Sequence, residues 1–423
     1  MNNTAVNKRA LVVGIVSRDE PLPILEDSLA ELAQLLDTLS FETIGSIIQH
    51  KEVKSPRTLI GKGKVESLKN AIKEHNISRV VFDEDLSPTQ ARNLKAELDV
   101  DIIDRCGVIL EIFTQHAKTH EAKVQIDLAR QEYSLSHLRR QWTHLSRQQG
   151  GQGIRGGEGE TQLEVDRRLA RSQIQVLKKK LKKIKAQRAT RNKNRSKFFK
   201  VAIVGYTNSG KSTLLNRLTD SDVLVQNKLF ATLDPSTRII KPDEKPSILF
   251  TDTVGFIKKL PHNLVASFRS TFEVIQDADL LLHVVDVFDP DYTQRIADTN
   301  EVIKDLGLDH IPRKLVLNKI DLKSDKPKQL QAIQSIHENA TLISAHADIG
   351  IDKLNKAVYS FFESQISEMT IDIPYGKEGC LDKIYDLTKV LSADYLEDKI
   401  VVHFRGATRD VNYLVNLVKS TGA

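Results

Sequence analysis

The chain has 423 residues, of which 40% are hydrophobic and 28% are charged, and its formal net charge is +6. This length predicts several globular domains, and the composition excludes both a wholly disordered chain and a bundle of membrane helices. The two cysteines, Cys106 and Cys380, cannot form a disulfide framework and show no metal-ligand spacing.

The positive charge is concentrated in one segment. Residues 165–200 contain 15 Lys or Arg residues against one acid, a net charge of +14, which leaves −8 for the rest of the chain. Such an asymmetry indicates a polyanionic partner. Residues 1–10 show no signal-peptide pattern, and the longest apolar run, near 280–285, is too short for a membrane span. A cytoplasmic monomer is expected, with peripheral attachment at a membrane left open.

The first hundred residues alternate between two hydrophobic patterns. They predict strands at 10–16, 43–49, 79–82 and 100–103, and helices at 24–39, 65–75 and 88–98. Strands that alternate with helices favour a parallel α/β sheet. We therefore expect an N-terminal α/β domain over residues 1–105.

Two apolar stripes with alternating steps of three and four residues follow. They are formed by Val124, Leu128, Gln131, Leu135, Leu138, Trp142 and Leu145, and by Ala170, Ile174, Leu177, Leu181 and Ile184. This spacing is typical of a coiled-coil seam. Between the stripes, residues 147–162 contain six glycines, and Thr161 with Glu164 has capping-box spacing that predicts a helix start near Gln162. Residues 106–197 are therefore expected to form an antiparallel helical hairpin with a glycine-rich tip and a basic linker.

A second α/β region is predicted over 198–365, and a small α+β domain over 366–423. The latter has strand patterns starting at Ile371 and at 390–395 and 399–404, and a helix pattern at 409–419.

The strongest motif follows the apolar strand 201–204. It consists of Gly205, Tyr206, Thr207, Asn208, Ser209, Gly210, Lys211 and Ser212, with Thr213 next in a predicted helix. The glycines let backbone N–H groups wrap around phosphate oxygens, and the helix N-terminus adds partial positive charge. Lys211 would reach the β- and γ-phosphates, and Ser212 would bind Mg²⁺.

Three further motifs follow in the order of a GTP site. Asp252, Thr253, Val254 and Gly255 come after the strand 248–250; the carboxylate suits the Mg²⁺ shell, and the Gly255 N–H can sense a γ-phosphate. Asn318, Lys319 and Asp321 follow the strand 314–317, and the Asp321 carboxylate can accept from N1–H and the amino group of guanine. Ser344 and Ala345 would place a backbone N–H near the guanine oxygen. GTP is thus expected rather than ATP.

The segment 230–238 reads Phe-Ala-Thr-Leu-Asp-Pro-Ser-Thr-Arg and lies between these motifs. A threonine here can bind Mg²⁺ and close over the γ-phosphate. We choose Thr232 over Thr237, with Phe230 and Ala231 beside the nucleotide. The predicted Mg²⁺ ligands are Ser212, Thr232 and Asp252, and the predicted catalytic groups are Lys211, Thr232 and Gly255.

Phe256 stands where many GTPases place a water-orienting glutamine. Because a phenyl ring cannot hydrogen-bond water, slow intrinsic hydrolysis that a partner stimulates is expected. Asn208 can help to hold K⁺ or simply brace the loop, and the sequence does not decide between these roles.

These motifs, together with the Gly-Glu-Thr-Gln-Leu-Glu sequence at 159–164 and the Phe-Ala-Thr-Leu-Asp-Pro segment, resemble the HflX family of the Obg–HflX superfamily of P-loop GTPases. The expected fold is therefore multidomain α/β, in which a P-loop GTPase domain with a parallel-rich sheet flanked by helices follows the hairpin. At the tip, the proline that the family usually has is absent, and Gln152 enters.

The resemblance implies binding to the large ribosomal subunit, ribosome-stimulated GTP hydrolysis, and splitting or recycling of idle or stalled ribosomes under stress. It also implies an ATP-responsive site in the first domain, where Gly61-Lys62-Gly63-Lys64 is the candidate, although a plain basic turn is favoured. Alternatives are a GTPase of ribosome assembly or RNA modification, and an RNA-binding switch with little turnover. The expected RNA contacts are Arg139, Arg140, Arg147, Arg155, Lys178, Lys179, Lys180, Lys182 and Lys183; a purely solubilising role is the alternative.

Overall fold

The computed structural model describes residues 8–16, 21–50, 55–148, 158–192, 198–219, 229–230, 233, 235–240, 247–259, 275–323, 327–376 and 378–420. Its contacts divide the chain into two compact units. The first comprises Met1–Lys185 with Gln226–Asp234 and Ile257–Ser270, and the second comprises Ala186–Val225, Pro235–Phe256 and Thr271–Ala423. Two short segments from the middle of the sequence thus belong to the N-terminal unit. The predicted division into four domains stays a prediction.

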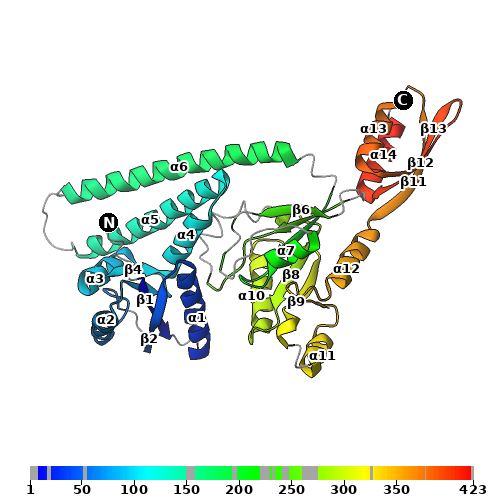
Figure 1. The fold of residues 1–423 in the computed structure, drawn as a ribbon. Coiled ribbons are helices and arrows are strands. Elements are labelled where there is room, and N and C mark those ends of the chain that lie inside the picture. The colour runs from blue at the N-terminus through cyan, green and yellow to red at the C-terminus, as the bar shows by residue number, and fades with distance from the viewer. Residues whose placement is uncertain are drawn as a thin grey trace, which may run out of the picture. The chain divides into compact units, whose positions relative to one another are not determined.

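The N-terminal unit is built on a parallel sheet of four strands, in the order β2-β1-β3-β4 (Figure 1). The strands are β1 (Arg9–Val16), β2 (Glu42–His50), β3 (Arg79–Phe82) and β4 (Asp101–Asp104), and the helices are α1 (Leu22–Thr38), α2 (Lys62–His75), α3 (Pro88–Leu98) and α4 (Arg105–His116). Because side chains alternate along β1, Val13 packs with α2 and α3, whereas Gly14 faces α1. A Cβ on Gly14 would lie 2.9 Å from Leu25, so glycine permits this close helix. The predicted alternation is confirmed.

Two long helices follow, α5 (His120–Gln148) and α6 (Glu158–Asn192). Val124 and Leu128 of α5 form a buried cluster with Ile174 and Leu181 of α6, as the seam predicts. The predicted start of the second helix near Gln162 is wrong, since α6 begins at Glu158. Glu158 and Glu160 put negative charge in its first turn, which the helix dipole favours. Residues 149–157 of the glycine-rich segment and the side chain of Trp142 lie outside the described part.

The second unit contains a sheet of six strands in the order β10-β9-β8-β5-β7-β6, parallel except for the β6/β7 pair. Its elements are β5 (Phe199–Val204), α7 (Lys211–Thr219), β6 (Ser236–Ile240), β7 (Ile248–Asp252), β8 (Leu280–Asp286), α10 (Tyr292–Asp305), β9 (Arg313–Asn318), the 3-10 helix η2 (Ile320–Lys323), α11 (Pro327–Ile336), β10 (Thr341–Leu342) and α12 (Ile351–Glu363). One core joins the sheet to α7 and α12, and a second contains Val285, Leu317 and Ile333 of α11. This arrangement is the expected parallel-rich sheet flanked by helices.

The C-terminal part of this unit forms a small antiparallel sheet, in the order β11-β13-β12. It comprises β11 (Ile366–Pro374), α13 (Glu378–Leu387), β12 (Lys389–Tyr395), β13 (Lys399–Ala407) and α14 (Thr408–Ser420). Ile384 of α13 and Leu414 of α14 are buried against Phe404 of the sheet, which confirms the expected α+β arrangement. Within the described residues, no helix is long and apolar enough to cross a membrane.

Candidate functional site

The loop between β5 and α7 depends on two glycines. Gly205 and Gly210 have φ angles of 148° and 93°, in the region that favours glycine. A Cβ at Gly205 would lie 2.1 Å from the Val284 carbonyl oxygen, and one at Gly210 would lie 2.2 Å from the Asn318 amide nitrogen. The loop is therefore closed against β8 and β9 in a way that only glycine allows, at the start of helix α7. Oxyanions bind readily at such a helix N-terminus.

Two polar groups expected to contact phosphate and metal lie at this loop. The Lys211 side chain is buried, and its Nζ donates to the Tyr206 carbonyl oxygen at 2.6 Å. Burial lowers the pKa of Lys211 to about 8, although the nearby Asp252 opposes this shift and Lys319 adds to it. Ser212 Oγ donates to Asp252 Oδ2 at 2.6 Å. These two oxygens, from different strand ends, suit a hard cation such as Mg²⁺.

Asn318 braces the side of the site where the base is expected. Its Nδ2 donates to the Ser209 carbonyl oxygen at 2.9 Å, and its Oδ1 accepts from the Ala345 N–H at 3.0 Å. In this structure the Ala345 N–H therefore bonds to Asn318 and is not directed at a guanine oxygen, as the sequence had suggested. Asn318 connects the phosphate loop to the Ser344-Ala345 segment after β10.

Asp321 supplies a carboxylate suited to a base. Its Oδ1 is enclosed and finds no hydrogen-bond partner among the described residues. A carboxylate oxygen in this state suits a ligand that brings its own N–H donors, as the N1–H edge of guanine does. Beside it, Lys319 adopts a φ of 68°, and its Nζ lies 2.7 Å from Asp286 Oδ2, an ion pair that the sequence did not reveal.

The Asp-Thr-Val-Gly segment lies directly against the phosphate loop. Phe256 donates its backbone N–H to the Gly205 carbonyl oxygen at 3.0 Å and accepts from the Thr207 N–H at 2.8 Å. A Cβ on Gly255 would lie 2.7 Å from Thr207 Cγ2, so this contact requires glycine. The Phe256 ring is 1% exposed and belongs to the core. The residue at the usual water-orienting position is thus a packing group.

The segment that contains the predicted switch threonine is attached to the N-terminal unit. Phe230, at a φ of 57°, packs its ring edge-on against Phe113 of α4 at 4.8 Å between centroids. His116 Nδ1 lies 2.8 Å from the Phe230 carbonyl oxygen. A positive φ for an aromatic residue is strained, and this contact with α4 holds it. Ala231 and Thr232 lie outside the described residues, so their predicted roles stay predictions.

The residues after Phe256 also belong to the N-terminal unit, where they meet a buried cluster of charges. Arg105 is 2% exposed and pairs with Asp83 at 2.6 Å and with Glu31 at 2.5 Å. Lys259 Nζ reaches the same Asp83 at 2.7 Å. Lys258 pairs with Asp27, and its backbone N–H donates to Glu31.

These ion pairs were not apparent from the sequence. Asp83 lies just after β3 and Arg105 just after β4, at the carboxyl edge of the parallel sheet, which is the usual place for a ligand in such folds. Here lysines of the chain itself occupy that edge. Burial raises the pKa of Asp83, but Arg105 and Lys259 outweigh it, and the pKa lies below its ordinary value.

The basic residues of the hairpin divide into two groups. Lys179, Lys180, Lys182 and Lys183 are exposed, whereas Lys178 pairs with Glu132 of α5 at 2.9 Å. Arg139, Arg140 and Arg147 lie in α5, where their side chains are outside the described part, and so is the whole of Arg155.

Two further predictions stay untested. Gly61 precedes α2, and its N–H donates to Gln49 Oε1 at 2.7 Å, but nothing shows whether Gly61–Lys64 meets ATP. Asn208 adopts a φ of 59° in the phosphate loop, and its role toward K⁺ is likewise a prediction.

Three family models match consecutive parts of the chain. They are described as GTP-binding GTPase N-terminal (residues 26–114), GTP-binding GTPase Middle Region (116–195) and 50S ribosome-binding GTPase (200–319). A solved GTP-binding protein of Sulfolobus solfataricus in complex with GDP covers 84% of this chain and 99% of its own, at 24% identity and a TM-score of 0.44.

Curated relatives match over nearly the whole length. The GTPase HflX of Gluconacetobacter diazotrophicus is 38% identical over 94% of both chains, and that of Flavobacterium psychrophilum is 44% identical over 89% of this chain and 96% of its own. The GTPase HflX of Escherichia coli is 37% identical over 88% and 87%. With these identities, the three matched models and the phosphate-loop geometry, the chain belongs to the HflX family of GTPases.

Proposed function

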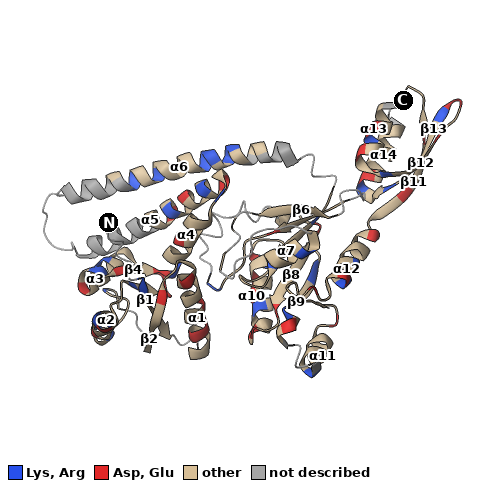
Figure 2. Cartoon of the chain, viewed as in Figure 1, with Lys and Arg blue, Asp and Glu red and all other residues tan. Residues whose placement is uncertain are grey.

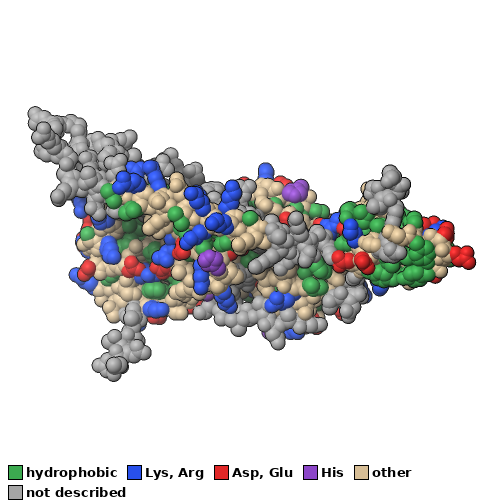
Figure 3. All heavy atoms as spheres, turned by 90° about the horizontal axis from the view of Figure 1, so that it is seen from above, with side chains coloured by type: hydrophobic (Ala, Val, Ile, Leu, Met, Phe, Trp, Pro, Cys, Tyr) green, Lys and Arg blue, Asp and Glu red, His purple; other side chains and the backbone are tan. Residues whose placement is uncertain are grey.

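We propose that this GTPase binds the large ribosomal subunit and uses GTP to split or recycle idle or stalled ribosomes in the cytoplasm, in particular under stress. The matched model of a 50S ribosome-binding GTPase supports the partner. The charge of the hairpin supports a contact with RNA. Lys and Arg side chains recur along α6 (Figure 2), and basic side chains gather on the face of the molecule shown in Figure 3.

The nucleotide would be held by the four motifs. Backbone N–H groups of 205–213 would cradle the phosphates with Lys211, while Ser212, Asp252 and Thr232 would hold Mg²⁺, which neutralises charge on the β- and γ-phosphates. Asp321 would accept from the guanine edge, with Asn318 bracing the loop. Because Phe256 is buried and cannot orient water, hydrolysis would be slow until the ribosome supplies the missing group or geometry.

One observation carries the link between GTP and the ribosome. The segments 226–234 and 257–270, which flank the predicted γ-phosphate sensors, belong to the same compact unit as the basic hairpin. Their attachments are specific: Phe230 contacts α4, and Lys258 and Lys259 pair with Asp27 and Asp83. A change at the γ-phosphate would therefore act on the unit that carries the RNA-binding helices.

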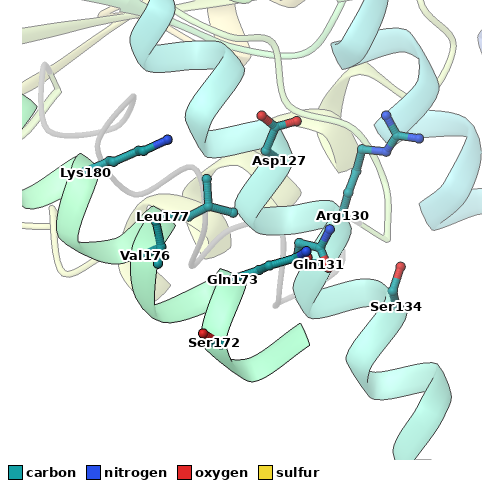
Figure 4. Close-up of a pocket in the computed structure, with 9 residues that line it drawn as sticks. All are labelled: Asp127, Arg130, Gln131, Ser134, Ser172, Gln173, Val176, Leu177 and Lys180. Carbon is teal, nitrogen blue, oxygen red and sulfur yellow. The ribbon is translucent and has the colours of Figure 1, made fainter. Parts of the chain in front are cut away.

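The hairpin also offers a groove with polar walls (Figure 4). Its volume is about 530 Å³, and it is lined by Asp127, Arg130, Gln131, Ser134, Ser172, Gln173, Val176, Leu177 and Lys180. Two amides and two cations in one groove suit contacts with the phosphates, sugars and edges of folded RNA, which proteins recognise largely by shape.

Pelleting with isolated large subunits tests this proposal. The protein should co-sediment with the subunits in GTP more than in GDP, and the subunits should raise its GTP turnover well above the rate of the protein alone. A charge reversal of Lys258→Glu or Asp27→Lys should reduce the stimulation, and the double variant should restore it. Arg57→Glu is the matched control, because its pair with Glu97 is exposed. Turnover that ignores the subunits would refute the proposal.

A further inference from the structure

The phosphate loop is attached to a neighbouring helix through one side chain. Tyr206 is the aromatic residue of the loop and is 9% exposed. Its ring lies under the guanidinium group of Arg295, with 4.5 Å between Arg295 Cζ and the ring centroid. Its hydroxyl donates to Asp298 Oδ2 at 3.1 Å. Arg295 and Asp298 both belong to α10, so a single helix contacts the face and the tip of the ring.

The two α10 side chains are themselves fixed. Arg295 Nε donates to Asp289 at 3.1 Å, and the Arg295 side chain is 12% exposed. Asp298 accepts a second hydrogen bond at 2.7 Å from Gln294, one turn earlier on the helix. Because both partners of Tyr206 have a second contact, the ring is gripped by groups that cannot easily rotate away. We call Arg295 and Asp298 the α10 clamp.

The clamp acts at the point where the loop meets the reacting phosphates. The carbonyl oxygen of Tyr206 accepts from Lys211 Nζ at 2.6 Å, and its neighbours Gly205 and Thr207 bond to the backbone of Phe256. Glycines lie at both ends of this loop, and flexible loops lose affinity when they must be ordered on binding. A rigid anchor on the Tyr206 ring would fix the loop backbone before the nucleotide arrives.

We infer that Arg295 and Asp298 are positioning residues for GTP: through the Tyr206 ring they hold the phosphate loop, and through the Tyr206 carbonyl they aim Lys211. Neither residue belongs to a nucleotide-binding motif, and no contact of theirs with nucleotide is needed. Since the loop serves phosphates shared by GDP and GTP, the clamp affects the affinity for both nucleotides more than the chemical step.

Nucleotide affinity and turnover of single variants test this inference. For Arg295→Ala, the loss of a partly buried cation–π contact should raise the Kd of both GDP and GTP about 3- to 30-fold. The ratio of the two Kd values should stay within about twofold, and kcat at saturating GTP should change less than KM. Tyr206→Phe keeps the ring under Arg295 and loses the bond to Asp298, so its effect should be smaller. Glu301→Ala, an exposed change on the same helix, should match the wild type.

A double-mutant cycle separates positioning from general support of the fold. In a Tyr206→Ala background, adding Arg295→Ala should change the Kd of GDP by less than about twofold, because the ring through which Arg295 acts is gone. An undiminished effect in that background would overturn the inference, since Arg295 would then act by another route. Arg295→Ala with the Kd of the Glu301→Ala control would overturn it as well. Thermal unfolding of each variant shows whether the fold is kept, and the cycle decides the outcome even where stability falls.

Discussion

Replacing Arg105 by Met should destabilise the N-terminal unit more than most single substitutions would. Arg105 is the buried partner of both Asp83 and Glu31 and also donates to the Ser28 carbonyl oxygen. Removing one member of a buried ion cluster typically costs about 3–5 kcal/mol, because it leaves charges without a partner. Lys259 and the Lys258 N–H remain near the two carboxylates, so we expect the lower end, about 3 kcal/mol at pH 7.

The effect should depend on pH with a defined sign. In the wild type, burial raises the pKa of Asp83, but Arg105 and Lys259 bring it below 3.8. The folded pKa is thus depressed, so the Asp83 contribution is present above pH 4 and is lost as the pH falls through the folded pKa. Without Arg105, burial is less opposed and the carboxylate takes up a proton more readily. The difference between variant and wild type should therefore be smaller at pH 5 than at pH 7.

Hydrogen exchange of β1 and β3 amides, measured by mass spectrometry on the full chain, gives the opening free energy of this unit. Arg57→Met is the control, since its exposed pair with Glu97 should contribute less than about 1 kcal/mol. An Arg105→Met protein with the exchange of that control at pH 7 would refute the assignment of a stabilising role to the cluster.

Three further predictions concern the nucleotide and the RNA. At pH 8, where about half of Lys211 is neutral in the free protein, GTP binding should take up roughly half a proton, because phosphates restore the charge; calorimetry in two buffers measures this, and no uptake would contradict the assigned pKa. Asp321→Asn should weaken GDP binding about 10- to 100-fold while improving xanthosine diphosphate, whose C2 carbonyl accepts where guanine donates; equal loss of both would argue against base recognition there. Changing Lys179, Lys180, Lys182 and Lys183 to Gln should weaken ribosome binding and flatten its salt dependence by about 0.7–0.9 per lost phosphate contact, at unchanged GTP affinity; Lys178→Gln should do less, since Lys178 already pairs with Glu132.

The sequence predicted those parts of the molecule whose chemistry dictates residue type at fixed spacing. The loop 205–212 lies between β5 and α7 as expected, because glycines and a helix start are required there. Strand β6 was missed because it is a partly exposed edge strand with little apolar alternation. The start of α6 was misplaced because a capping box was weighed above acidic residues that precede it.

Long-range pairs could not be predicted in the same way. Arg105 meets partners 22 and 74 residues away, and Asp83 meets Lys259 across 176 residues. Tyr206 and Asp298 are separated by 92 residues. Nothing in the local pattern around these residues distinguishes them from ordinary surface charges, because the chain topology alone brings them together.

Sedimentation of intact ribosomes with the purified protein tests the central claim most directly. In GTP or a non-hydrolysable analogue, the protein should convert ribosomes into separate subunits and migrate with the large one, whereas in GDP the ribosomes should stay intact. Ribosomes that remain intact in all three nucleotides would contradict the proposed splitting activity.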